Sequence, residues 1–156
     1  MENELDKIKN VAHYISVTGI IVKNGRFLIC QRSPNERIFP GKWCVPGGKM
    51  EQRDIIAGDK GTHDHWLDVL ENTLRKEIRE ETGLEIQNIG YVSSLALMRP
   101  NGFTTIIISM HADHHLGEVR LDKNELVDHA WVTLDEAKDY DLIDNIYEQL
   151  EVVAKR

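Results

Sequence analysis

The chain has 156 residues, a length typical of a single domain with a substantial hydrophobic core. Its formal net charge of −7 argues against a general affinity for nucleic acid or anionic membranes, although a divalent cation can bring a phosphorylated substrate to an acidic site. The two cysteines form no CxxC pair, the N-terminus does not resemble a signal peptide, and no apolar run has membrane-spanning length. We therefore expect a cytoplasmic protein without stable nucleic-acid or membrane partners.

The N-terminal part contains two strand patterns joined by a tight turn. Residues 14–22 are rich in β-branched side chains, and residues 26–32 form the returning strand. The Asn-Gly pair between them is favoured in a two-residue hairpin turn. Residues 33–51 hold three of the four prolines and interrupt regular structure. Residues 52–65 have the composition of a polar loop with room for one short turn.

A helical period begins soon after this polar loop. Asp68 and Glu71 have the spacing of a capping box at its start, although Thr62 or Asp64 also fit an earlier start. Gly83 stands where a left-handed C-terminal cap is favoured. The predicted helix therefore ends just past an acidic cluster.

The C-terminal half combines three strand patterns with a helical tail. The strands are predicted, in chain order, at residues 89–98, 104–112 and 129–134. Residues 134–156 are mostly helical in pattern, with one apolar stripe formed by Leu142, Ile146 and Leu150. Strands mixed with helices in no strict alternation predict one layered α/β or α+β domain.

The acidic helix places one carboxylate on its apolar side. At about 100° per residue, the apolar stripe consists of Leu70, Leu74 and Ile78. Glu81 projects into this stripe, while Glu77 and Glu80 adjoin it. A carboxylate that leaves water must be paired, protonated or bound to a metal, and the like charges of Glu77 and Glu81 repel each other. A divalent cation resolves both problems, whereas the alternative is an ordinary charged helix whose Glu81 reaches solvent or a lysine.

Two segments together resemble the signature of the Nudix hydrolase family: PGGKME at residues 46–51 and KEIREETGL at residues 76–84. The family motif is Gly, five residues, Glu, seven residues, then Arg-Glu-apolar-x-Glu-Glu-x-Gly-apolar. Gly48 matches its first glycine, and RSP, FPGKWCVPGGK and HAWVTLDEA elsewhere in the chain are also similar to the family. The resemblance implies a single Nudix domain over residues 1–156, an α/β/α sandwich with a central mixed sheet.

The chain departs from the motif in two residue types and in length. Lys76 replaces the arginine and loses its planar fork. Counting back eight positions from Lys76 puts Asp68 where the family has its first glutamate. Gly48 and Lys76 are 28 positions apart where the motif has 14, so we expect an insertion at about residues 52–66.

The resemblance also implies the chemistry and the residues that perform it. Nudix enzymes use Mg²⁺ or Mn²⁺ to hydrolyse the diphosphate bond of a nucleoside diphosphate linked to another group. By resemblance, the metal ligands are the Gly48 carbonyl and the carboxylates of Glu77, Glu80 and Glu81. Glu77, Glu80 or a later acid would activate the attacking water, and Lys76 would orient a glutamate.

Further candidates lie outside the two signature segments or beside them. Gly47 lets the backbone approach metal and phosphate, and Arg32 resembles a phosphate-contacting arginine, with a surface arginine as the alternative. A later acidic ligand is expected from Glu118, Glu125 or Asp128, of which Glu125 is favoured.

Three functions follow from these observations. The first is a Mg²⁺-dependent pyrophosphohydrolase acting on a small-molecule nucleotide, such as a (d)NTP or a modified nucleotide in nucleotide-pool housecleaning. The second is an isomerase of diphosphate esters on the same fold, and the third is a catalytically silent Nudix-like binding domain. The intact acidic cluster favours the first. The sequence leaves open whether the C-terminal helix forms a homodimer or only packs.

Overall fold

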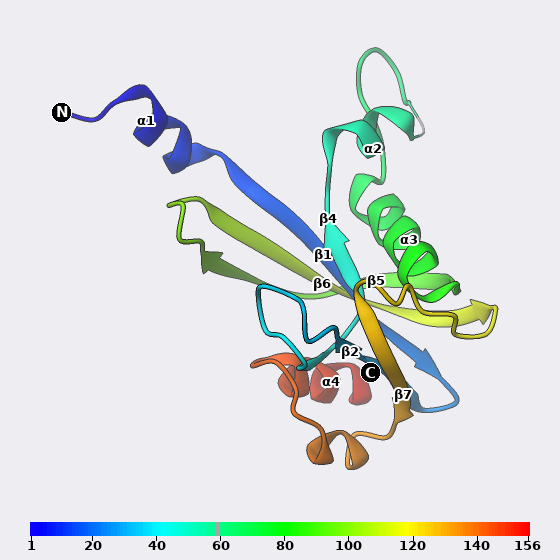
Figure 1. Ribbon diagram of the computed structural model, residues 1–156. Helices are drawn as coiled ribbons and strands as arrows, with labels where there is room; N and C mark the ends of the chain where they lie inside the picture. The colour runs from blue at the N-terminus through cyan, green and yellow to red at the C-terminus, as the bar shows by residue number, and fades with distance from the viewer. Residues whose placement is uncertain (59) are drawn as a thin grey trace.

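The computed structural model describes residues 1–58 and 60–156, which form a seven-stranded mixed sheet flanked by helices (Figure 1). The helices are α1 (Glu4–Val11), α2 (Gln52–Ala57), α3 (Val69–Thr82) and α4 (Ile146–Ala154), with a 3-10 helix at Glu136–Asp139. The strands are β1 (His13–Lys23), β2 (Arg26–Arg32), β3 (Trp43–Cys44), β4 (Gly47–Lys49), β5 (Glu85–Met98), β6 (Thr104–Leu116) and β7 (Leu126–Val132). This architecture confirms the expected α/β class with a central mixed sheet.

Strand β1 organises the sheet. It pairs in parallel with β6, which continues antiparallel to β5, while β2 connects β1 to β3 and β7. The β1–β2 hairpin has only two registered pairs, so the earlier part of β1 can pair with β4 instead. Val17 lies opposite Gly48, and Thr18 lies opposite Gly47. This pairing brings the Pro-Gly-Gly segment to the middle of the sheet.

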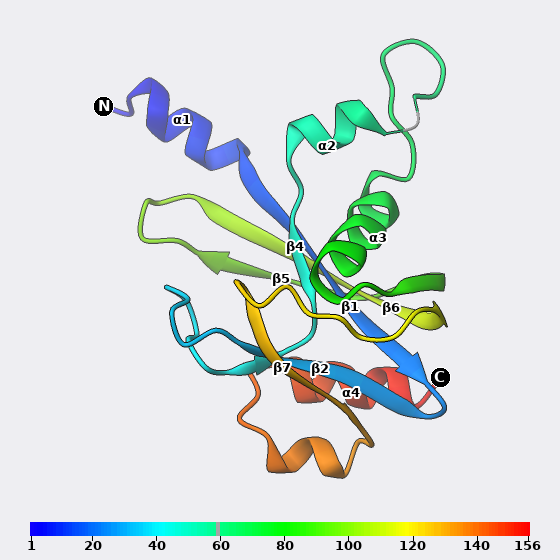
Figure 2. The same ribbon diagram turned by 45° about the vertical axis from the view of Figure 1, so that its right-hand side comes forward.

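Helices α3 and α4 lie on opposite sides of the sheet (Figure 2). Helix α3 buries Leu74 and Ile78 completely. It approaches β1 closely at Gly19, where an added Cβ would lie 3.0 Å from Leu74 Cδ1 and 3.3 Å from Ile78 Cδ1. The absence of a side chain at Gly19 therefore fixes the distance between the acidic helix and the sheet.

The C-terminal helix is shorter than its sequence pattern predicts. Residues 134–156 contain only the 3-10 turn and α4, because Asn145 adopts a left-handed conformation with φ 75° directly before α4. The apolar side of α4, with Ile146, Leu150 and Val153, belongs to the buried core. This stripe packs within its own chain.

Near the insertion, one local prediction was incomplete and another was wrong. The segment expected to be a polar loop with room for one short turn contains the six-residue helix α2, whose Ile55 is half-buried. The capping box at Asp68 does not form, because Asp68 has a left-handed backbone with φ 52° and its side chain makes no cap hydrogen bond. The opposite end of α3 follows the prediction, since Gly83 has φ 75° and donates its N–H to the Arg79 carbonyl at 2.9 Å.

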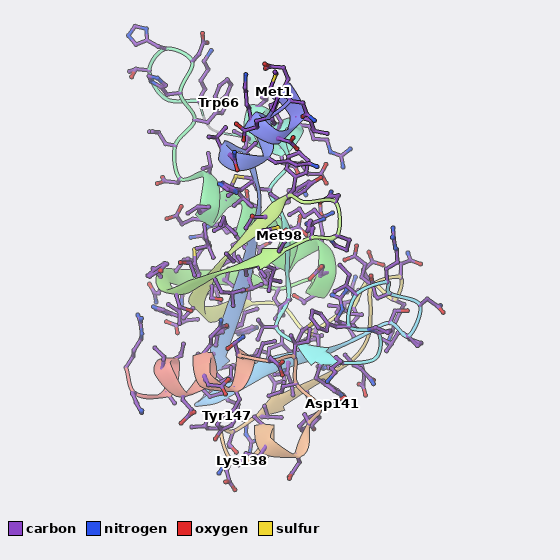
Figure 3. All side chains as sticks on the ribbon, turned by 90° about the vertical axis from the view of Figure 1, so that its left-hand side faces the viewer. Met1, Trp66, Met98, Lys138, Asp141 and Tyr147 are labelled. Atoms are coloured by element: carbon purple, nitrogen blue, oxygen red, sulfur yellow. The ribbon has the colours of Figure 1, made fainter. Side chains whose placement is uncertain are left out.

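The insertion projects from the sheet rather than covering the C-terminal helix. Trp66 lies toward the end of the molecule that carries Met1, whereas Tyr147 of α4 lies toward the opposite end (Figure 3). Of the helices in the described part of the chain, none combines the length and apolarity needed to cross a membrane.

Candidate active site at the end of the acidic helix

Glu81 is a buried carboxylate in the apolar side of α3, as the helical projection predicts. Its residue surface is only 8% exposed, and Oε2 accepts a hydrogen bond from the Gly47 N–H at 3.1 Å. Burial and the adjacent carboxyl group of Glu125 raise the pKa of Glu81 well above its usual range, against the smaller opposing effect of the Gly47 hydrogen bond. Without a cation, burial and the neighbouring acid therefore favour the protonated form of Glu81.

The segment before β7 is fastened to the end of α3, and this brings Glu125 to Glu81. The Arg120 N–H donates to the Thr82 carbonyl at 2.8 Å, and the Asp122 N–H donates to the Glu81 carbonyl at 2.9 Å. Glu125 follows three residues later, with its own N–H bonded to the Asp122 carbonyl at 3.1 Å.

Glu125 is the one of the three later acids whose charge acts on the α3 carboxylates. Its negative charge raises the pKa of both Glu77 and Glu81. Neither Asp128 nor Glu118 is among the main causes of these two pKa shifts, and the backbone of Glu118 lies near the Gly83 cap. The geometry therefore favours Glu125 over the other two candidates.

Glu77 lies directly over the second glycine of the Pro-Gly-Gly segment. A Cβ added to Gly48 would collide with the Glu77 carboxylate, while a Cβ added to Gly47 would collide with the Val17 carbonyl. Burial raises the pKa of Glu77, and the Lys76 ammonium opposes this effect. The two glycines thus allow both contacts, with the strand backbone on one side and a carboxylate on the other.

Lys76 connects three carboxylates at the surface of this cluster. Its Nζ lies 3.4 Å from Glu77 Oε1, 3.2 Å from Glu80 Oε2 and 3.3 Å from Asp54 Oδ2. Burial disfavours the ammonium, but the hydrogen bond to Glu80 and the negative charges outweigh it and raise the pKa of Lys76. Lys76 therefore stays charged and holds Glu77 and Glu80 side by side.

Asp54, and not Asp68, occupies the place of the first glutamate in the family motif. It lies six positions after Gly48, and the motif likewise places its first glutamate six positions after its first glycine. The ion pair joins Asp54 to Lys76, whereas Asp68 precedes α3. Placing the surplus residues after Asp54 satisfies both the spacing from Gly48 and the contact with Lys76, so we propose that the insertion starts a few residues later than position 52.

Arg32 is held by protein groups beside the cluster. Its Nε donates to the Ile38 carbonyl at 3.0 Å, and its Nη2 lies 3.4 Å from Glu36 Oε2. Burial raises the pKa of the Cys44 thiol, and the nearby guanidinium charge of Arg32 opposes this effect. The neighbouring Ser33 N–H donates to the Glu125 carbonyl at 2.9 Å, so the same loop supports the acidic segment. A structural role for Arg32 is thus visible, and its phosphate contact stays a prediction.

The acidic cluster has the donor set of a magnesium site but is not in a metal-ligating arrangement. Within the described residues, no three His, Cys, Asp or Glu side chains meet the geometry of a metal site. The carboxylates of Glu77 and Glu80 instead contact Lys76, and that of Glu81 accepts the Gly47 N–H. Carboxylate oxygens beside a glycine backbone are the ligands that Mg²⁺ prefers, and the raised pKa of Glu81 reflects buried negative charge that a cation would offset. The residues therefore fit a divalent cation.

Comparison with known proteins identifies the same segments. A family model described as the NUDIX domain matches residues 13–152. The nucleoside triphosphatase NudI of Klebsiella pneumoniae is 27% identical over 139 residues, which cover 83% of this chain and 89% of that protein. The NAD-capped RNA hydrolase NudC of Vibrio vulnificus is 29% identical over 117 residues, which cover 68% of this chain but only 42% of that protein.

Solved structures show the same fold. The crystal structure of a MutT NUDIX hydrolase from Burkholderia pseudomallei has a TM-score of 0.71 at 23% identity and covers 91% of this chain and 98% of its own. The NUDIX domain of Shewanella oneidensis NrtR, in complex with ADP ribose, has a TM-score of 0.70 at 17% identity and covers 99% of this chain and 98% of its own. At these identities the likeness concerns the fold alone.

Proposed function

The chain belongs to the NUDIX family and is a hydrolase of phosphorus-containing acid anhydrides, and we propose that it cleaves the diphosphate bond of a small nucleotide with the help of Mg²⁺. One observation carries this proposal. Glu77 and Glu81 of α3 contact the two glycines of β4, with Glu125 beside Glu81 and Glu80 beside Lys76. In the described residues, Lys76 is the only cation within 4.0 Å of these carboxylates. This excess of negative charge suits a divalent cation that bridges the carboxylates to a pyrophosphate.

Four carboxylates and one carbonyl would hold the cation, namely Glu77, Glu80, Glu81, Glu125 and the backbone of Gly48. Such a cation supplies a positive charge that polarises the phosphoryl oxygens and stabilises the charge that develops on them. The protein's own contribution is position: Gly47 fixes Glu81, and Lys76 keeps Glu77 and Glu80 together. Mn²⁺ meets the same ligand preferences.

The base that accepts a proton from the attacking water is Glu77 or Glu80. Both carboxylates lie within 3.4 Å of Lys76 Nζ, and the Glu80 side chain is 57% exposed while that of Glu77 is 15% exposed. Glu80 can therefore meet bulk water, whereas Glu77 faces the glycine backbone. A base raises the rate by about 10²–10⁴-fold, so loss of the correct residue should be obvious in kcat.

The substrate class follows from the relatives rather than from the site. NudI is named as a nucleoside triphosphatase and matches this chain over most of both lengths, which supports a nucleoside triphosphate. NudC is more than twice as long as the matched region, so its capped-RNA activity is a weaker guide. The net charge of −7 also argues against a long polyanionic substrate.

The test is a hydrolysis screen over NTPs, dNTPs, ADP-ribose, NADH and dinucleoside polyphosphates. Wild type and the Glu80→Gln variant are each assayed with Mg²⁺ and with chelator. For NTPs and dNTPs, phosphate release is measured with and without a coupled pyrophosphatase. For ADP-ribose, NADH and dinucleoside polyphosphates, a coupled alkaline phosphatase releases phosphate from the monophosphate products. We expect one substrate class to be cleaved, and both chelator and variant to abolish or strongly reduce cleavage. No turnover by wild type would support the silent binding domain, and rearrangement of an added diphosphate ester without released phosphate would support the isomerase.

A further inference from the structure

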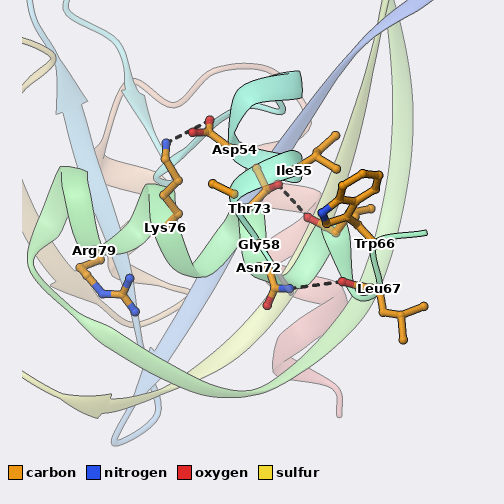
Figure 4. A pocket seen from close by; sticks show the side chains of 11 residues that line it. Asp54, Ile55, Gly58, Trp66, Leu67, Asn72, Thr73, Lys76 and Arg79 are labelled. Atoms are coloured by element: carbon orange, nitrogen blue, oxygen red, sulfur yellow. Dashed lines mark hydrogen bonds and ion pairs between the residues drawn. The ribbon is translucent and has the colours of Figure 1, made fainter. Parts of the chain in front are cut away.

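A pocket of about 370 Å³ lies between the insertion and α3 (Figure 4). This volume falls in the range of about 300–1,000 Å³ found for small-molecule sites. The insertion contributes Ile55, Trp66 and Leu67, and α3 contributes Asn72 and Lys76. The family motif does not contain the inserted residues, so part of the pocket wall is built from residues outside the motif.

The aromatic wall of the pocket is held in place by the insertion itself. The Trp66 Nε1–H donates to the Ile56 carbonyl at 3.2 Å, and the Lys60 ammonium lies 5.5 Å from the centre of its ring. The loop between them is closed by a bond from the Gly61 N–H to the His65 carbonyl at 2.7 Å. The indole is therefore anchored by its polar edge and presents apolar surface to the cavity.

Lys76 joins this pocket to the acidic cluster. Its side chain lines the cavity, and its Nζ touches the carboxylates of Glu77 and Glu80. In Figure 4, Lys76 reaches Asp54 at one end of the cavity while Trp66 and Leu67 lie toward the other. A group attached to a pyrophosphate at the acids is thus one side chain away from a partly open, partly aromatic pocket.

The cations of the pocket are already neutralised, which argues against a second phosphate as its occupant. Lys76 pairs with three carboxylates. Arg79 holds both carboxylate oxygens of Glu85, at 2.7 and 3.1 Å. A neutral planar group is better matched to an indole, an isoleucine and a leucine than an anion would be.

Asn72 supplies the polar group that could read the edge of such a ring. Its Nδ2 donates to the Leu67 carbonyl at 3.3 Å. Its Oδ1 and second N–H make no other hydrogen bond among the described residues, so one acceptor and one donor remain for a ligand. An amide with this pair of groups can bond to the edge of a nucleobase in the way that protein amides bond to adenine.

We propose that the pocket between the insertion and α3 binds the nucleobase of the substrate. The proposal rests on the proposed nucleotide hydrolase function and deepens it by naming the residues that select the base. Ile55, Trp66 and Leu67 provide the surface for the ring, and Asn72 contacts its edge. The insertion is thereby a specificity element beside the carboxylates of α3, to which Lys76 connects it.

The experiment compares neighbouring isoleucines on α2. Ile55 lines the pocket, whereas Ile56 is 55% exposed and does not, so Ile55→Ala is the test and Ile56→Ala the matched control. Binding of AMP, GMP, CMP and UMP in chelator is followed by tryptophan fluorescence, and Trp66→Phe assigns the signal. Turnover of the preferred nucleotide is measured in parallel with Mg²⁺.

We expect Ile55→Ala to weaken binding and to raise KM by about 5-fold or more with little change in kcat, because the variant loses apolar surface that would be buried against the ring. Ile56→Ala should keep the affinity and KM of wild type. Asn72→Ala should reduce the differences in affinity among AMP, GMP, CMP and UMP. Unchanged affinity and KM in Ile55→Ala, or equal losses in both isoleucine variants, would overturn the proposal. Base-dependent quenching assigned to Trp66 in a protein without turnover would sustain the pocket while rejecting the proposed hydrolase function.

Discussion

The carboxylate of Glu81 and the backbone N–H of Gly47 are joined by a 3.1 Å hydrogen bond across 34 residues of sequence. This contact links α3 to the glycine segment of β4 and places a buried acid where a cation can replace its proton. Because burial, followed by contact with Glu125, raises the pKa of Glu81, the folded protein keeps a proton that the unfolded chain releases.

Stability in chelator should therefore depend on pH with a defined sign. The stabilisation is complete below the ordinary glutamate pKa of about 4.3 and is lost progressively as the pH rises toward the raised folded value. In Glu81→Gln, the amide oxygen can still accept the Gly47 N–H and carries no titrating proton, so this loss should largely disappear. Urea unfolding at pH 5, 7 and 8.5 measures both proteins, and equal slopes with pH would contradict the protonated-pair interpretation.

Alanine at the two adjacent glycines should have different consequences. Gly47→Ala meets the backbone of Val17, which cannot move without disturbing the sheet, and should destabilise the protein by ~2 kcal/mol or more. Gly48→Ala meets only the flexible Glu77 side chain, so the protein should fold with a smaller loss of stability and lose most of its activity. Thermal unfolding and kcat measured for both variants test this contrast, which fails if Gly48→Ala retains wild-type kcat.

The two aspartates proposed for the first motif position can be separated directly. Asp54 pairs with Lys76 at 3.3 Å, while Asp68 makes no side-chain cap bond at the start of α3. Asp54→Asn should lower kcat by about 10-fold or more, the scale of losing a group that orients a catalytic residue. Asp68→Asn is the matched control and should stay within about twofold. The reverse order of effects would restore the assignment made by counting back from Lys76.

The sequence was informative wherever a local pattern decided the structure. The Asn-Gly turn, with φ 51° and 74°, the Gly83 cap and the burial of Glu81 all follow from residue type and helical period. The sequence was uninformative where a contact between residues far apart in the chain determined the structure. Residue counting alone cannot show on which side of an insertion the motif continues, so Asp54 was overlooked until its ion pair with Lys76 was visible.

Glu125 illustrates the intermediate case. The sequence placed it among three later acids, but only the pairing of the preceding segment with the end of α3 distinguishes them. The bonds from Arg120 to Thr82 and from Asp122 to Glu81 are backbone contacts, and no side-chain pattern encodes them. Such contacts depend on the chain path after β6, which composition and periodicity do not determine.

Glu125 should contribute to metal affinity independently of catalysis. Its carboxyl group adjoins Glu81, so Glu125→Gln removes one of the oxygens proposed to hold Mg²⁺, while Asp128→Asn is the control at the nearby acid that lies toward Cys30. A ligand that binds only the folded state raises Tm according to its concentration relative to Kd. We expect Mg²⁺ to raise the Tm of wild type and Asp128→Asn equally. The same rise in Glu125→Gln should need a Mg²⁺ concentration about 10-fold higher or more. The same Mg²⁺ titration in Glu125→Gln as in wild type would remove Glu125 from the ligand set and return the choice to Glu118.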